Sequence, residues 1–169
     1  DGRASAYRNV RRAVVHPDYQ YDGTATTDRV RNDLALIELD RPIRNTRVIP
    51  FKTSERPTKG DRIGVVSYAL DRSEAPSLQE VCHVMARQKG VLVMSCDVNF
   101  GSSGAPIFNI EDNEAKIVSI VSAKAEVEGE QVSLGTALGA PLALLQAELV
   151  AGKGVFLESG PAGKRVRVD

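Results

Sequence analysis

The chain has 169 residues, of which 22 are Lys or Arg and 22 are Asp or Glu, so its formal net charge is zero. This length suits one domain with a full core or parts of two small ones, and the composition is that of an ordinary globular protein. The charge balance argues against a nucleic acid or an anionic membrane surface as the main partner. No apolar run approaches the roughly 18 residues that a membrane span requires, so no span is expected.

Short apolar runs separated by turn residues recur along most of the chain and predict antiparallel β-strands. In chain order they cover residues 10–15, 34–39, 47–51, 63–68, 80–87, 91–96, 105–110, 116–123 and 131–138. Residues 141–149 instead have apolar residues at helical spacing, begin with a proline and are followed by Gly152, which predicts a helix. Many short strands closed by one C-terminal helix predict an all-β fold built on a β-barrel. Residues 151–169 are rich in glycine and are expected to form a loose tail.

The most informative motif is a serine flanked by glycines, Gly101-Ser102-Ser103-Gly104. The glycines allow a tight turn and the close approach of a substrate carbonyl. The backbone N–H groups of Gly101 and Ser103 can then converge on the carbonyl oxygen as an oxyanion hole. A serine nucleophile also needs a base and an orienting acid. We interpret Ser103 as a candidate nucleophile, with an ordinary Gly/Ser-rich loop as the alternative.

Two other hydrolase plans do not fit the order of residues. The elbow of α/β-hydrolases has the pattern G-x-S-x-G and a histidine after the serine; here the second glycine comes one residue early and no histidine follows Ser103. The subtilisin order of Asp, His and Ser is formally met by Asp33, His83 and Ser103. However, His83 lies within a strand-like run, and we expect it to be structural.

Several motifs resemble those of the chymotrypsin/trypsin family of serine peptidases, and they occur in the order that the family has. Asn32-Asp33-Leu34-Ala35-Leu36 resembles the segment with the catalytic aspartate, and Gly101–Pro106 resembles the segment with the catalytic serine. The segments at residues 14–19, 60–63 and 116–119 resemble three further family motifs. From residue 7 to about residue 150, the chain is most similar to the bacterial, glutamyl-endopeptidase-like branch.

The resemblance implies a chymotrypsin-like two-barrel fold with a C-terminal helix. Residues 1–55 would be the C-terminal part of the first barrel, which stays incomplete because they supply only about three of its roughly six strands. Residues 56–150 would form the second barrel and the helix. The activity implied for the intact protein is that of a serine endopeptidase with a protein or peptide substrate and with no cofactor or metal. A protease-like binding module without activity is the alternative.

The resemblance assigns Ser103 as the nucleophile and Asp33 as the residue that orients the catalytic histidine. The family's histidine segment has no counterpart in these residues. His16 stands 17 positions before Asp33, whereas the family places its histidine about 45 positions before the aspartate. We expect His16 to be a strand-end residue. The base would then come from a missing N-terminal segment of the same protein, and the chain alone would be inactive.

The substrate-binding and disulfide assignments also follow from the resemblance. Asp97 lies six positions before Ser103, where trypsins have the pocket aspartate that pairs with a basic side chain; the alternative is that it turns away. Ser119 and Val121 lie on the strand that resembles the wall of the substrate cleft. Cys82 and Cys96 are expected to form a disulfide, with two reduced thiols as the alternative, and the paired Cys spacing of a zinc site is missing. A disulfide would place the protein in the periplasm or outside the cell.

Overall fold

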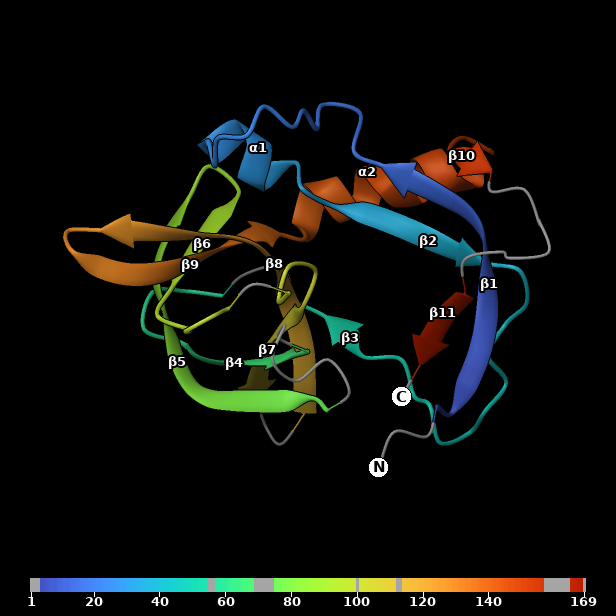
Figure 1. Ribbon diagram of the computed structural model, residues 1–169, viewed down its shortest axis with the longest axis horizontal. Helices are drawn as coiled ribbons and strands as arrows, with labels where there is room; N and C mark the ends of the chain where they lie inside the picture. The colour runs from blue at the N-terminus through green and yellow to red at the C-terminus, as the bar shows by residue number, and fades with distance from the viewer. Residues whose placement is uncertain are drawn as a thin grey trace.

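The computed structural model describes residues 4–54, 57–68, 75–99, 101–111, 114–156 and 165–168. These residues form a closed β-barrel and a separate open sheet, with helix α2 (Gly139–Val150) beside the open sheet (Figure 1). The fold is therefore mostly β, as predicted.

The barrel is built from six strands that the sequence predicts with ends shifted by a few residues. They are β4 (Arg62–Ser67), β5 (Ser77–Gln88), β6 (Val91–Met94), β7 (Pro106–Glu111), β8 (Glu114–Val127) and β9 (Glu130–Ala137). Their order is β8-β7-β4-β5-β6-β9, and β9 pairs back with β8 to close the barrel. All six pairings are antiparallel.

The barrel interior holds one apolar core that includes the disulfide. Alternate residues of each strand point inward, as Ile63 and Val65 of β4 and Ile107 of β7 do, because side chains of a strand alternate between its two faces. Cys82 of β5 and Cys96, just beyond β6, are bonded to each other and buried in this core. The predicted disulfide is confirmed. It fixes the segment that leads to the Gly101–Gly104 turn.

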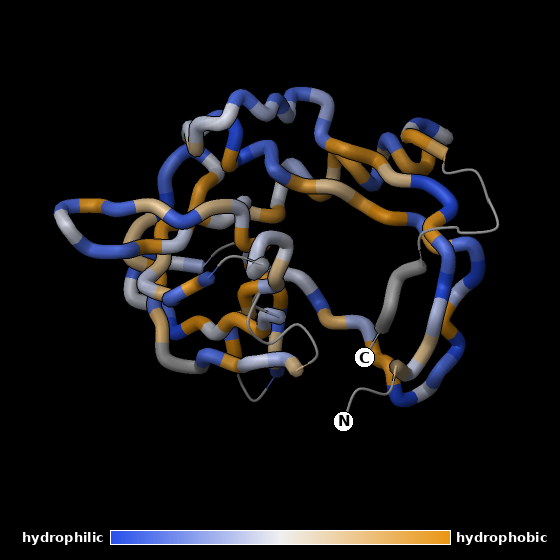
Figure 2. Tube along the Cα trace, viewed as in Figure 1, coloured by the Kyte–Doolittle hydropathy of each residue, from blue (hydrophilic) through white to orange (hydrophobic). Residues whose placement is uncertain are grey.

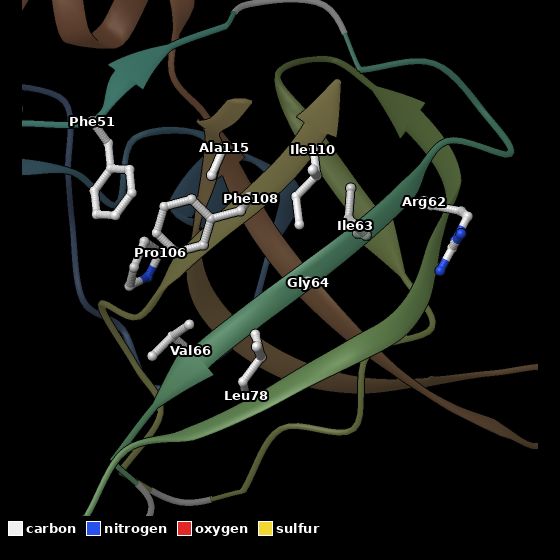
Figure 3. A pocket seen from close by; sticks show the side chains of 10 residues that line it. All are labelled: Phe51, Arg62, Ile63, Gly64, Val66, Leu78, Pro106, Phe108, Ile110 and Ala115. Atoms are coloured by element: carbon white, nitrogen blue, oxygen red, sulfur yellow. The ribbon is translucent and has the colours of Figure 1, made fainter. Parts of the chain in front are cut away.

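The outer face of the barrel carries an apolar groove (Figure 3). Its volume is about 560 Å³, and its walls come mainly from β4 and β7. Pro106, Phe108 and Ile110 of β7 face it, and Phe51 packs edge-on against Phe108 with 4.8 Å between the ring centroids. The segment that connects the open sheet to the barrel therefore covers part of this groove. No described residue that lines the groove is a nucleophile or a base, so it lies apart from the candidate site.

Residues 47–51 do not form the predicted strand. The extended segment comes later, at β3 (Lys52–Thr53), and it pairs in parallel with β8. The Lys52 Nζ lies 2.8 Å from the Glu114 carboxylate at the start of β8. The connecting segment is thus attached to the barrel rather than to the open sheet.

The second sheet is open. Its central strand, β1 (Ala6–Val15), pairs antiparallel with β2 (Ala35–Leu39), β10 (Val155–Phe156) and β11 (Arg165–Val168). Among the described residues β2 pairs only with β1, so the prediction of an incomplete first barrel is confirmed. Apolar residues continue along β2 (Figure 2), although Ile37 is 55% exposed.

The C-terminal part of the chain adds two strands to the open sheet. The sequence analysis did not predict these strands. The predicted helix is present as α2, and it contacts β1 and β2. Residues 151–169 are not a loose tail where the structure describes them, because β10 and β11 both pair with β1. Two-residue β10 and four-residue β11 are too short to give a clear alternating pattern.

Candidate active site

Ser103 lies in a tight turn between β6 and β7 whose backbone depends on glycine. Gly101 and Gly104 have φ angles of 93° and 83°, a region that other residues rarely adopt. The N–H of Ala105 donates to the Ser102 carbonyl oxygen at 3.0 Å. Gly104 N–H donates to the Val121 carbonyl oxygen of β8 at 2.8 Å, and Val121 N–H donates to that of Ala105 at 2.9 Å. The turn is therefore fixed to the barrel on both sides of Ser103, whose side chain is exposed.

The N–H groups of Gly101 and Ser103 make no hydrogen bond to any residue that the structure describes. The N–H of Ser102, which lies between them, donates to the carbonyl oxygen of Asn99 at 3.0 Å. Two free backbone donors beside an exposed hydroxyl are the arrangement that stabilises a developing oxyanion. This geometry is compatible with the oxyanion hole predicted from Gly101 and Ser103.

Asp33 follows a short helix that the sequence analysis did not predict, α1 (Thr27–Arg31). Thr26 caps this helix, because its Oγ1 accepts the N–H of Arg29 at 3.2 Å. The N–H of Asp33 then donates to the carbonyl oxygen of Val30 at 3.2 Å. Asp33 therefore stands at a fixed position, directly before the start of β2.

Two hydroxyl groups of the barrel hold the Asp33 segment. Ser122 Oγ donates to Asp33 Oδ2 at 2.6 Å. Thr136 Oγ1 of β9 lies 2.6 Å from the carbonyl oxygen of Val30 and 3.0 Å from that of Asp33, so its proton is shared between them. Ser122 and Thr136 are both buried. The barrel thus determines where the carboxylate of the open sheet lies.

Asp33 and Ser103 line the same cavity, which we call the inter-sheet cleft. Its volume is about 650 Å³. The other lining residues are mostly apolar and come from the two sheets and α2: Val15, Tyr19, Leu34, Ala35, Leu36, Ile37, Thr53, Gly104, Ile117, Ile120, Val121, Leu138 and Leu142. A carboxylate and a serine hydroxyl that are 70 residues apart in the chain are therefore brought to one cleft.

Ser103 also lines a second cavity of about 480 Å³, which we call the side pocket. Its lining residues come from the segment before α1, α1 itself, the segment between β6 and β7 that includes the turn, and β8: Tyr21, Gly23, Ala25, Arg29, Val98, Asn99, Gly101, Ser103, Val121, Ser122, Ala123 and Lys124. Val121 lines both the side pocket and the inter-sheet cleft. Val121 therefore lies beside Ser103, and its contact with substrate stays a prediction.

Two of the predicted substrate-binding residues lie elsewhere. Ser119 is completely buried, and its Oγ donates to the carbonyl oxygen of Thr136 at 2.9 Å. The Asp97 side chain is 72% exposed and lies 3.4 Å from Lys124 Nζ, so it is paired at the surface and lines neither cavity. This placement agrees with the alternative that Asp97 turns away, because the segment after Cys96 carries the carboxylate to the surface.

The chain has two histidines, and both lie outside the two cavities that Ser103 lines. His16 is buried directly after β1, where its Nδ1 accepts the N–H of Asp18 at 3.3 Å. His83 is exposed on β5. Neither imidazole lines the inter-sheet cleft or the side pocket. His16 therefore lies at the end of a strand, as expected.

The sequence analysis missed Ser122, although a signal was present. Ile-Val-Ser occurs twice in succession, at residues 117–119 and 120–122. The first copy was matched to the cleft strand, whereas the structure places the serine of the second copy on Asp33. The role of Thr136 had no comparable signal, because it depends on the contact between β9 and α1.

Within the described residues, no group of three or more His, Cys, Asp or Glu side chains is placed to hold a metal ion. No described helix is both long and apolar enough to cross a membrane.

Comparison with known proteins agrees with this geometry. The family model described as "Trypsin-like peptidase domain" matches residues 2–118, a range that includes Asp33 and Ser103. Among solved structures, kallikrein-related peptidase 10 is similar, with a TM-score of 0.61 and 16% identity, over 85% of this chain and 73% of that chain. A search of the curated proteins found no match. The structural likeness supports the fold, and the family model, which covers more than half of the chain, shows that the chain belongs to the trypsin-like peptidase family.

Proposed function

We propose that the intact protein is a serine endopeptidase in which Ser103 attacks the scissile carbonyl of a protein or peptide and forms an acyl-enzyme. The proposal rests above all on one observation: Asp33 and Ser103 line the same cleft while the Ser122 hydroxyl fixes the Asp33 carboxylate. The free N–H groups of Gly101 and Ser103 support an oxyanion hole, in which each donor contributes on the order of 3 kcal/mol to the transition state.

The proposed chemistry requires an imidazole between Asp33 and Ser103. The imidazole takes the proton of Ser103 Oγ as the Oγ–C bond forms, and it gives a proton to the leaving amine as the C–N bond breaks. Asp33 keeps the ring in the correct tautomer. Because Oδ2 of Asp33 already accepts the Ser122 hydroxyl, Oδ1 is the oxygen available to the imidazole N–H.

We infer that this histidine comes from a segment of the same protein outside the 169 residues. His16 and His83 do not line the cleft, and the exposed Ile37 of β2 is an apolar surface that such a segment would cover. Without the base, Ser103 stays a neutral alcohol. The loss of a triad member costs on the order of 10⁴-fold in turnover or more, so the chain alone is expected to be inactive.

The absence of an imidazole from the cleft also favours a second candidate, a protease-like binding module without catalytic activity. The two candidates differ in one property of the intact protein. An enzyme activates Ser103, whereas a binding module holds peptides in the cleft and leaves Ser103 unreactive.

Labelling of the intact protein with a fluorophosphonate probe separates these candidates. We expect rapid labelling that Ser103→Ala abolishes and that Asp33→Asn reduces on the order of 10⁴-fold, because the imidazole loses its orienting partner. Ser102→Ala is the matched control, since the neighbouring Ser102 is buried and its Oγ contacts no described hydrogen-bond partner; it should leave labelling nearly unchanged. An intact protein that binds peptides and stays unlabelled would instead support the binding module.

We also propose a periplasmic or secreted location. The Cys82–Cys96 disulfide supports it, because such bonds persist mainly in oxidising compartments. Cell fractionation, followed by alkylation of free thiols without reductant, tests this proposal. Recovery of the protein in the cytosol with two alkylated cysteines would contradict it.

A further inference from the structure

An open cavity at the start of β1 lies apart from both cavities that Ser103 lines. The segment that follows β2 runs beside the first half of β1 (Figure 1), and the two border a volume of about 550 Å³. We call this cavity the arginine pocket; its charged and hydroxyl-bearing lining residues are Ser5, Arg8, Arg44, Thr46 and Arg47. A strand rises about 3.3 Å per residue, so roughly 23 Å separate Arg8 from Val15, which lines the inter-sheet cleft. The arginine pocket is therefore not part of the candidate active site.

The charge of the arginine pocket has one sign. Three of its described lining residues are arginines, and none is acidic. No described carboxylate lies within ion-pair distance of Arg44 or Arg47. By contrast, Arg41 in the same segment lies 3.7 Å from the Asp40 carboxylate. A concave site lined by charges of one sign concentrates ligand groups of the opposite sign, so the pocket favours an anion.

Arg8 is fixed in place by the carbonyl groups around it. Its Nε donates to the carbonyl oxygens of Arg41 at 3.2 Å and Pro42 at 3.3 Å. Its Nη1 donates to that of Tyr7 at 2.8 Å, and its Nη2 donates to that of Pro42 at 3.1 Å. Each of these two Nη groups has a second N–H that no described acceptor takes. Because Arg8 is already ordered, it loses less side-chain entropy on binding an anion.

The other two arginines flank a tight turn that begins at Asn45. The N–H of Val48 donates to the Asn45 carbonyl oxygen at 3.0 Å, and the N–H of Arg47 donates to Asn45 Oδ1 at 3.0 Å. These two hydrogen bonds define the backbone that carries Arg44 and Arg47, whose side chains are exposed. The guanidinium groups are therefore accessible to a ligand from solvent.

The placement of the donors favours a sulfate or phosphate group over a carboxylate. Ser5 and Arg8 line the pocket from the start of β1, whereas Arg44, Thr46 and Arg47 line it from the segment after β2. A tetrahedral oxyanion has oxygens on several sides and can accept from both segments, while a carboxylate accepts in one plane. Because the cations are exposed, each contact is weak, and several anionic groups have to act together.

We propose that the arginine pocket binds a short polyanion, a chain that carries several sulfate or phosphate groups. The formal net charge of the protein is zero, so this binding depends on the local arginines rather than on overall attraction. The site shares no lining residue with the inter-sheet cleft or the side pocket. The inference therefore does not depend on the proposed peptidase activity.

Isothermal titration of the intact protein with three short polyanions tests the proposal. The ligands are a heparin-derived hexasaccharide for sulfate, a six-unit polyphosphate for phosphate, and hexaglutamate for carboxylate. We expect the hexasaccharide, the polyphosphate or both to bind at least tenfold more tightly than hexaglutamate. Arg44→Gln combined with Arg47→Gln should weaken this binding on the order of twentyfold, since each exposed ion pair contributes about fivefold at most. Arg44→Lys combined with Arg47→Lys should restore part of the affinity, because lysine keeps the charge but not the paired donors.

Arg11→Gln combined with Arg31→Gln is the matched control. It removes the same number of charges, but both arginines lie outside the pocket, Arg11 at 3.5 Å from Glu38 and Arg31 at 3.4 Å from Asp28. We expect the control variant to bind within about twofold of the natural protein. Binding of the hexasaccharide alone or of the polyphosphate alone would support the site and identify its ligand group. Equal affinity for hexaglutamate, no binding of either other ligand, or equal losses in the two glutamine variants would overturn the proposal.

Discussion

The barrel is closed and well buried, whereas the second sheet is open and more exposed. The candidate site is divided between the two. Ile107 in the barrel is 0% exposed, whereas Ile37 in the open sheet is 55% exposed. Ser103 and the N–H groups of Gly101 and Ser103, which have no hydrogen-bond partner among the described residues, belong to the barrel, which closes on itself and contains the disulfide. Asp33 belongs to the open sheet. Ser103 is therefore supported by a closed barrel, while Asp33 lies beside a sheet that stays open in the described residues.

The largest expected difference is in the free energy of unfolding when one isoleucine in each region is replaced by alanine. Ile107→Ala leaves a cavity in a packed core and should lower the free energy of unfolding by about 2–5 kcal/mol. Ile37→Ala in the isolated chain removes a side chain that is already mostly in water, so we expect a loss below about 1 kcal/mol. Urea denaturation of both variants measures the contrast. Equal losses would mean that the open sheet is as well packed as the barrel.

Removal of the disulfide should affect the barrel next most strongly. The bridge joins two cysteines that are 14 positions apart in the sequence. Closing a loop of that size stabilises the fold by roughly 3 kcal/mol, because it restricts the unfolded chain. Cys82→Ala combined with Cys96→Ala should lower the free energy of unfolding by that order. Mass analysis of the unmodified protein should show a gain of two hydrogen atoms on reduction, because each sulfur becomes a thiol. An unchanged denaturation midpoint in the double variant would contradict the role of the bridge.

Thr136→Val tests the junction between the two regions. It removes the hydroxyl that contacts the carbonyl oxygens of Val30 and Asp33. The loss of this contact should cost about 1 kcal/mol, as for a typical hydrogen bond, because the Val30 oxygen still accepts the Asp33 N–H. Amide hydrogen exchange should then increase in residues 30–34. Ser133→Ala is the control, since its Oγ donates to the Met94 carbonyl oxygen within the barrel and to no other group in the described part of the chain. Faster exchange at residues 30–34 in both variants would show that the effect is not specific to the junction.

The Lys52–Glu114 pair, which joins the connecting segment to β8, should have the smallest effect because it is exposed to solvent. The hydrogen bond from Lys52 lowers the pKa of Glu114 below its ordinary value of 4.5, and the same bond raises the pKa of Lys52 above 10.5. The stabilisation is therefore complete between these two ordinary values. It is lost as the pH falls through the lowered pKa of Glu114 or rises through the raised pKa of Lys52.

Glu114→Gln should lower the melting temperature slightly at neutral pH, and the difference from the natural protein should disappear in acid. Thermal melts of both proteins at several pH values measure this difference in melting temperature. A difference that grows in acid would contradict the sign of the pKa shifts.

The sequence predicted the barrel, the helix and the disulfide because local patterns and family motifs report on them directly. It also identified Ser103 and Asp33, which the structure brings to one cleft. It could not decide whether Asp97 faces the substrate or the surface, because sequence spacing does not reveal which way a carboxylate turns after Cys96. It chose Ser119 over Ser122 because two identical tripeptides follow each other. The pairing of β10 and β11 with β1 joins residues more than 140 positions apart, and no short-range pattern encodes it.

Fluorophosphonate labelling of the 169-residue chain, alone and with the histidine-bearing segment restored in cis or as a separate peptide, tests the central claim most directly. We expect negligible labelling of the chain alone and full labelling after restoration, with Ser103→Ala abolishing it and His16→Ala and His83→Ala leaving it nearly intact. Full labelling of the isolated chain that His16→Ala abolishes would show instead that the base lies within these residues.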